Sequence, residues 1–461
     1  MRALIMLPLV VALGWGGELR VGAGRAVINP PTGWPGGPER VHDDLHAKAL
    51  VFEREGTAAA LVVCDLAVIA NEAVEEARAV IRQKTGIPGE RVIISTTHTH
   101  TAFDLAIWMP DNGVPEPMQG YRKALPLRIG EAVAEAYGKL APARVWTAKG
   151  HEATLSFNRR FLMKDGAAKM NPGKMNPNIV RPLGPIDPEV AVVLFDTPEG
   201  RPIATLVNFA MHLDTVGGRQ VSADYAYTLA KILAQAKGPD MLTVFSIGTA
   251  GNINHIDVRS PEPQKGYEEG ARIGAVLAGE VLRTYKHLER MDVATLRTGR
   301  EAVKLPLPIL QSGDVERAEE LRSRRAGPNP PTFLEQMWMQ RILDTAKRDG
   351  RPREVEVQVI AIGNQLAWVG LPGEIFVELG LAIKNASPFP NTIVHSLSSD
   401  WIRYVPNRKG YAEGGYEAIN TRGAPGTGEL LVETATRLLL QAHRGYIGAG
   451  GVLTPADRAR R

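Results

Sequence analysis

Two histidines separated by one residue stand at the end of an apolar run and are the first candidates for chemistry. The run Val92 to Thr97 is rich in β-branched residues, and His98-Thr99-His100 follows it directly. A short apolar run of this kind is typical of a strand buried on both faces. Because side chains alternate along a strand, an H-x-H pair at its end can direct both imidazoles to one cavity. The pattern predicts half of a metal site, although the two histidines could also only bond nearby carbonyls.

Two later hairpins each end in a further candidate ligand, His212 and Glu374. Two histidines and one carboxylate with an open position form a zinc hydrolase set, in which zinc acidifies a bound water and polarises a carbonyl. Each residue also has an ordinary alternative. His212 could be a packed histidine at a strand end, and Glu374, after Pro372-Gly373, could stabilise a helix start through the helix dipole.

The composition limits the class of protein. The chain has 461 residues, 44% of them hydrophobic, which is enough for one large domain or two to three average ones. Lys and Arg number 54 against 50 Asp and Glu, so the charge balance predicts no nucleic-acid partner. The single cysteine, Cys64, excludes an internal disulfide and a thiolate cluster. Any metal ligands must therefore be His, carboxylate or Tyr.

Residues 1–17 contain one positive charge, an apolar core and a Gly-rich end, which is the pattern of a signal peptide. We therefore predict a secreted or periplasmic protein; a buried or disordered amino-terminal segment is the alternative. No other stretch approaches the ~20 apolar residues of a spanning helix, so no transmembrane span is expected. Residues 446–461 are a basic, Gly-rich tail.

Apolar strands alternate with amphipathic helices over most of the chain. Helices are expected over residues 71–85, 124–140, 223–236, 266–285, 315–325, 332–348, 375–386 and 428–442. This alternation predicts an α/β fold with a large mixed sheet flanked by helices, in a single domain over residues 18–445. The charged segment 312–353 is predicted to be a helical insertion with a solvated surface.

Six motifs in order resemble the neutral, non-lysosomal ceramidase family. They are Val21 to Pro30, Val41 to Val51, His98-Thr99-His100, the strand ending at His212, Leu371-Pro372-Gly373-Glu374, and Tyr404-Val405 with Tyr416-Glu417. The resemblance covers about residues 20–445. It implies a zinc-dependent amidase with a large α/β catalytic domain that cleaves the amide of N-acylsphingosine (ceramide) by attack of zinc-bound water.

The resemblance also implies roles for individual residues. By position, zinc would be held by His98, His212, Glu374 and Tyr404. His100 would give or take a proton, while Arg159 and Tyr416 would hold polar groups of the substrate. A site with two imidazoles and one carboxylate keeps a positive charge that suits an oxyanion. As alternatives, Arg159 could pair with a surface carboxylate and the tyrosines could be half-buried strand aromatics.

The segment Gly251 to His255 departs from the family pattern. The family has Gly-Asp-x-Ser-Pro there, and Asn254 takes the place of the serine near the scissile amide. An amide can donate a hydrogen bond to an oxyanion but cannot act as a nucleophile, so we expect Asn254 to hold a substrate oxygen. His255 could add a third function or only cap a loop. We also expect this chain to lack the carboxyl-terminal immunoglobulin-like domain that many members carry.

Two other functions fit the same residues. One is hydrolysis of a soluble N-acyl amino acid or amino sugar by the same chemistry. The other is a non-catalytic metal- or carbohydrate-binding scaffold, which the loss of the serine would allow. The substrate, the acyl length, the identity of the metal and the oligomeric state do not follow from the sequence.

Overall fold

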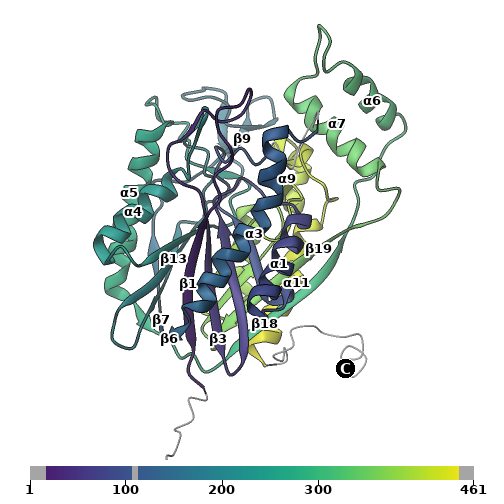
Figure 1. The fold of residues 1–461 in the computed structure, drawn as a ribbon. Helices are drawn as coiled ribbons and strands as arrows, with labels where there is room; N and C mark the ends of the chain where they lie inside the picture. The colour runs from purple at the N-terminus through teal and green to yellow at the C-terminus, as the bar shows by residue number, and fades with distance from the viewer. Residues whose placement is uncertain (1–16, 106–112, 446–461) are drawn as a thin grey trace, which may run out of the picture.

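The structure is a computed structural model that describes residues 17–105 and 113–445. The tail, and all but the last residue of the predicted signal peptide, lie outside the described residues. The fold is α/β, as predicted, and its strands are divided among three main sheets flanked by helices (Figure 1). Among the described residues, no helix is both long and apolar enough to cross a membrane.

The first sheet carries the predicted histidine strand at its edge. Its order is β5 (Val92–Thr96), β4 (Thr57–Cys64), β3 (His46–Arg54), β1 (Arg20–Val27) and β6 (Ala141–Pro142). The hairpin of β3 and β4 is antiparallel, and β5 runs parallel to β4. All five residues of β5 are buried, as expected for an apolar strand covered on both faces.

Two helices cover the outer face of the first sheet, namely α1 (Asn71–Thr85) and α3 (Glu116–Gly138). Helix α3 begins well before the predicted position 124, at Glu116, with Pro117 in its first turn, where proline is favoured. Gly22 on β1 allows α3 to pack closely, since a Cβ atom there would lie 1.9 Å from the carbonyl oxygen of Ala136. A residue with a side chain at this position would push the helix away from the sheet.

The second sheet carries His212 beyond one of its strands. Its order is β15 (Leu242–Ile247), β13 (Pro202–Phe209), β12 (Glu189–Asp196), β7 (Arg144–His151) and β17 (Glu289–Arg290). Helices α4 (Tyr225–Lys237) and α5 (Tyr267–Thr284) lie against this sheet, at the left in Figure 1. The hairpin of β12 and β13 forms as its two apolar runs and the turn between them predict.

The third sheet consists of β18 (Leu296–Leu305), β19 (Arg353–Ile362), β20 (Leu366–Gly370) and β22 (Asn391–His395). Helices α8 (Val377–Ala386) and α11 (Thr427–His443) pack on it. All three sheets meet in one apolar core, in which the ring of Phe52 lies 5.6 Å from that of Phe195 and 5.2 Å from that of Trp368.

The segment between β18 and β19 forms two helices, α6 (Asp314–Ser323) and α7 (Phe333–Ala346). They project from the body at the upper right of Figure 1 and share a small apolar cluster that includes Leu321 and Ile342. Helix α7 begins with a capping box, in which Thr332 and Glu335 satisfy each other's backbone amides. The predicted helical insertion thus corresponds to a helix pair held to the body at one side.

Short elements connect these layers and build the candidate site. They are β2 (Arg40–Val41), β8 (Phe157–Asn158), β9 (Arg160–Met163), β10 (Ala168–Met170), β11 (Ile179–Pro182), β14 (Gln220–Val221), β16 (Ile253–Asn254), β21 (Glu374–Ile375), β23 (Tyr404–Val405), α9 (Arg408–Glu413) and α10 (Tyr416–Ile419).

Candidate metal and active site

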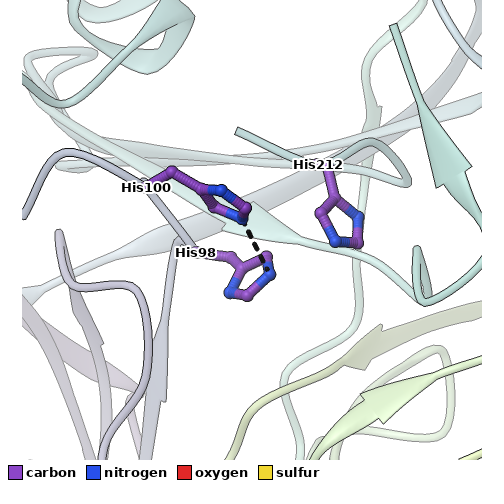
Figure 2. Close-up of side chains that lie close together, drawn as sticks. All are labelled: His98, His100 and His212. Carbon is purple, nitrogen blue, oxygen red and sulfur yellow. Dashed lines mark hydrogen bonds between the residues drawn. The ribbon is translucent and has the colours of Figure 1, made fainter. Parts of the chain in front are cut away.

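Three histidines from two sheets converge at one point (Figure 2). His98 and His100 follow β5, and His212 follows β13. One ring nitrogen from each lies within 4.8 Å of the others, and the Nε2 atoms of His98 and His100 are 3.4 Å apart. The sequence placed His98 and His212 at strand ends, and the structure brings these ends together.

The backbone holds His98 in an unusual conformation. Its φ angle is 69°, in the left-handed region that a residue with a side chain adopts at a cost of about 1–3 kcal/mol. Its amide donates to the carbonyl of Leu66, while the hydroxyls of Thr99 and Thr101 both donate to the carbonyl of Ser222. These bonds fix the turn that directs both imidazoles inward.

Backbone carbonyls fix the orientation of two of the rings. The Nδ1 atom of His98 lies 2.6 Å from the carbonyl oxygen of Ala67, and that of His212 lies 2.8 Å from the carbonyl oxygen of Ala250. A carbonyl only accepts, so Nδ1 carries the hydrogen in both rings. Their Nε2 atoms therefore present lone pairs to the centre, the arrangement that metal-ligating histidines adopt.

Glu374 meets these lone pairs from β21, a short strand that follows β20 of the third sheet along the chain. Its Oε2 lies 3.3 Å from Nε2 of His98 and 3.4 Å from Nε2 of His212, and its Oε1 accepts from the indole N–H of Trp401. The interpretation of Glu374 as a residue of a helix start is wrong. It lies in β21, paired with β23, and α8 begins only at Val377.

An added positive charge would stabilise the group formed by Glu374, His98 and His212. Oε2 of Glu374 is buried and has no hydrogen-bond donor among the described residues. Burial alone would raise the pKa of the Glu374 carboxyl, but His98 and His212 hold it well below its usual value. In return, Glu374 raises the pKa of His98 against the effect of burial. A proton on His98 or a bound cation would supply the missing charge.

The donor set fits a transition metal such as zinc. Imidazole nitrogens and one carboxylate suit Zn²⁺, whereas Ca²⁺ and Mg²⁺ prefer oxygen ligands. His98, His212 and Glu374 are all at most 4% exposed, while His100 has more exposed surface, although burial and the neighbouring His98 lower the pKa of its ring to about 3. The geometry also places His100 close enough to serve as a ligand.

Arg159 lies beside His212, inside the protein. Its Nη1 is 3.1 Å from Nε2 of His212, and its Nε donates to Glu417 at 2.9 Å. The alternative that Arg159 pairs with a surface carboxylate is wrong, because Glu417 is 1% exposed. Burial and the Arg159 cation together lower the pKa of His212. The Nη2 atom of Arg159 has no partner among the described residues and is free to bind a further acceptor.

Two tyrosines line the same side of the site. Tyr404 stands opposite Glu374 in the pairing of β21 with β23, and its ring lies 5.2 Å from both the Arg159 guanidinium and the Tyr416 ring. Burial raises the pKa of Tyr404 well above its usual value. Tyr416 also stacks on Phe333, the first residue of α7. The helix pair therefore reaches the edge of the candidate site.

Asn254 approaches from the two-stranded sheet of β8 and β16. It lies in β16, next to Ile253, whose carbonyl accepts from the amide of His212. Its Oδ1 accepts from the amide of Ile256, but its buried Nδ2 has no acceptor among the described residues. The Nδ1 atom of the neighbouring His255 lies 3.0 Å from a carboxylate oxygen of Asp214.

Three contacts of the site were not found from the sequence. Trp401 orients Glu374, Glu417 holds Arg159, and Asp214 pairs with His255. Glu417 directly follows Tyr416 in one of the motifs that resemble the ceramidase family, so this motif could have indicated Glu417 as a residue of the site. Trp401 and Asp214 carry no such signal, because their roles depend on long-range pairing of strands.

Taken together, the elements define an α/β protein with a buried histidine and carboxylate centre at the meeting point of three sheets. No family model matches the sequence, and no curated protein matches it. Among solved structures, the chain is similar to a neutral ceramidase from Pseudomonas aeruginosa, with a TM-score of 0.73, 19% sequence identity, and coverage of 96% of this chain and 77% of that one. It is also similar to a ceramidase complexed with C2, with a TM-score of 0.73, 18% identity and coverage of 95% and 77%.

The chain therefore has the fold of neutral ceramidases over nearly its whole length. The resemblance that the sequence motifs indicate is confirmed at the level of the fold.

Proposed function

We propose that this protein is a zinc-dependent amidohydrolase of the neutral ceramidase family that cleaves the amide of N-acylsphingosine or a similar N-acyl lipid. The observation that carries the proposal is the convergence of the Nε2 atoms of His98 and His212 on the unsatisfied Oε2 of Glu374, in a fold shared with neutral ceramidases. A buried carboxylate oxygen without a hydrogen-bond donor is costly unless a cation binds it.

The residues that would hold zinc are His98, His212, Glu374 and Tyr404. When bound, zinc would supply Lewis-acid polarisation of the scissile carbonyl and acidify a water. The carbonyls of Ala67 and Ala250 keep both imidazoles in the ligating tautomer. Trp401 holds the Glu374 carboxylate at its other oxygen.

Other side chains would act on the substrate. His100, beside the centre and open to solvent, would accept or deliver a proton at Nε2. The free Nδ2 of Asn254 and Nη2 of Arg159 would donate to substrate oxygens that become negative during attack. The Tyr416 hydroxyl would hold a polar group of the substrate at the edge of the site.

A lipid substrate is supported by an apolar cavity beside β8 and β16. The cavity has a volume of about 460 Å³ and is lined by Phe157, Phe161, Ile179, Val180, Ile256 and Val258 among others. This volume lies within the range of small-molecule sites, about 300–1,000 Å³. Because Phe157 pairs with Asn254, the cavity borders the strands that carry the proposed amide donor. An acyl chain would fit such a lining.

We also propose that residues 1–17 direct export, which would place the protein where extracellular or periplasmic lipids are accessible. Amino-terminal sequencing of the protein recovered from the culture medium or periplasm would test this. Cleavage after the apolar core supports export, and an intact Met1 on exported protein contradicts it.

The reaction is tested by measuring fatty-acid release from detergent-dispersed N-acylsphingosine and, in parallel, from a soluble N-acyl amino acid. Each assay is run with added zinc and with a chelator. Zinc-dependent release from the sphingolipid is the expected result. Release only from the soluble compound would keep the metal chemistry and reject the lipid substrate. No release from zinc-loaded protein on either compound would favour a non-catalytic scaffold.

A further inference from the structure

A second cavity lies at the carboxyl-terminal end of α7, where the helix pair joins the body. Its volume is about 620 Å³. Five cationic side chains line it, namely Lys347, Arg348, Arg351, Arg353 and Arg422. Such a concentration of positive charge in one hollow is unfavourable unless anions balance it.

The carboxylates around the cavity balance only part of this charge. Arg353 pairs with Asp400 at 2.8 Å, and Arg422 pairs with Asp344 at 2.7 Å. Within the parts of the chain that the structure describes, the side chains of Lys347 and Arg348 have no ion-pair partner, and Arg351 donates only to the carbonyl of Arg348. The cavity therefore has three cationic groups in excess.

Arg422 is the buried member of these five cationic side chains, and burial destabilises its charged form. The side chain of Arg422 is 7% exposed, and its partner Asp344 is 48% exposed, so this ion pair is only partly shielded from water. Burial lowers the pKa of Arg422 to about 10. Burial and the nearby Arg353 lower the pKa of Arg348 as well. An anion in the cavity would relieve both effects.

We propose that this cavity is a binding site for a phosphate-type oxyanion, supplied either by a soluble phosphate compound or by a phospholipid headgroup. Guanidinium groups present forked N–H donors that match the oxygens of phosphate, and Lys347 adds a mobile point charge. Phosphate binding here does not require the proposed hydrolase reaction.

A short series of hydrogen bonds connects the proposed phosphate site to the candidate active site. Arg353 holds Asp400, which accepts from the amide of Trp401, and the Trp401 indole donates to Glu374. On the other side, Thr421 precedes Arg422 and bridges to Tyr404. A bound anion would thus contact side chains that neighbour the residues orienting the metal centre.

The binding of inorganic phosphate to the full chain, measured by calorimetry at constant ionic strength, tests the proposal. Saturable binding is expected, and the double variant Arg348→Gln/Arg351→Gln should weaken it by at least about tenfold. The matched control is Arg272→Gln/Arg322→Gln, which removes the same charge from exposed residues of α5 and α6 that pair with Glu269 and Glu319. It should leave phosphate binding within about twofold. If the double variant does not fold, Lys347→Gln, at an exposed position, is measured in its place.

Two results would overturn the proposal: no saturable phosphate binding, or equal losses in the cavity variant and the control. Vesicles of phosphatidylcholine with and without phosphatidylglycerol identify the source of the anion. Binding only to vesicles with phosphatidylglycerol, lost in the cavity variant, indicates a lipid headgroup. Phosphate binding without vesicle binding indicates a soluble phosphate compound.

Discussion

The metal centre and the basic cavity present opposite electrostatic arrangements only a few residues apart. Around Glu374, the Nε2 atoms of His98 and His212 converge on the unsatisfied Oε2, while Arg159, the cation beside His212, is paired with Glu417. At the end of α7, five cations gather around two carboxylates. The two regions meet at Asp400 and Trp401, which contact Arg353 on one side and Glu374 on the other. An unbalanced cluster of charge in a folded protein is a reason to look for a ligand of the opposite sign.

In a third region of the same molecule, the charges of the buried side chains are balanced. Arg78, 3% exposed, pairs with the carboxylates of Glu75 and Glu356, and Arg300 also contacts Glu356, so two cations face two carboxylates. Each charge there has an opposite partner, so we assign that network a structural role. The contrast between balanced and unbalanced charges can be tested by removing single members of each.

The largest effect is expected for Glu374→Ala. Loss of the carboxylate should lower zinc affinity by at least about 100-fold and reduce amide hydrolysis with it. Zinc content after dialysis and fatty-acid release are measured together. Glu354→Ala, at an exposed position on β19, is the control and should leave both unchanged. Undiminished turnover of Glu374→Ala in the presence of a chelator would contradict the assignment.

Asn254→Ala should reduce kcat by about 100-fold while zinc content stays constant, because one donor to the developing oxyanion is lost. Stability should fall by only about 1 kcal/mol, since Oδ1 bonds a single backbone amide. Asn254→Ser should retain more activity than Asn254→Ala, because a hydroxyl can also donate. Equal rates for wild type and Asn254→Ala would exclude Asn254 from the reaction.

Arg159→Leu should lower the free energy of unfolding by about 3 kcal/mol, because buried Glu417 loses its closest cationic partner. The double variant Arg159→Leu/Glu417→Leu should regain most of this stability without regaining activity. Urea unfolding and hydrolysis rates separate the two contributions. Full activity in the stable double variant would show that Arg159 serves the fold alone.

Lys384→Met should have a smaller effect, in a region where charges are matched. Lys384 contacts Asp187 and Glu189, and these partners raise its pKa against the effect of burial. Lys384 and Lys149 also hold the pKa of Glu189 below its ordinary value of 4.5, although burial opposes this. The variant should cost about 2 kcal/mol at pH 7.

The sign of the pH dependence follows from these two shifts. A lowered carboxyl pKa stabilises the fold above the unfolded value and loses this contribution as the pH falls through the folded value. A raised lysine pKa stabilises it below the unfolded value. The difference between wild type and Lys384→Met should therefore be largest from about pH 5 to 10 and shrink in acid. A difference that does not change between pH 7 and pH 3 would contradict this account.

Local patterns predicted much of the fold because the elements follow local periodicity. The hairpin of β12 and β13 and helix α1 form where apolar runs and amphipathic spacing place them. The start of α3 was misplaced because its first two turns lack a clear apolar stripe. The strand status of Glu374 could not be found, because β21 exists only through pairing with β23, thirty residues later.

The residues of the candidate site that follow from a local pattern could be predicted from the sequence, and those that depend on long-range contacts could not. Strand ends indicated His98, His100 and His212 by local spacing, and the structure brings them together. The contact of Arg159 with Glu417 spans 258 residues, so no local pattern could reveal it. The ligand set itself stays a prediction, since His100 and Tyr404 both lie near enough to compete for one position.

The most direct test is a crystal structure of the zinc-loaded protein with anomalous diffraction recorded at the zinc edge. We predict one strong peak in contact with Nε2 of His98, Nε2 of His212 and Oε2 of Glu374, and no peak in the basic cavity. The same map decides whether His100 or Tyr404 completes the ligand set. No zinc at this centre, or zinc bound only elsewhere, would contradict the proposed function.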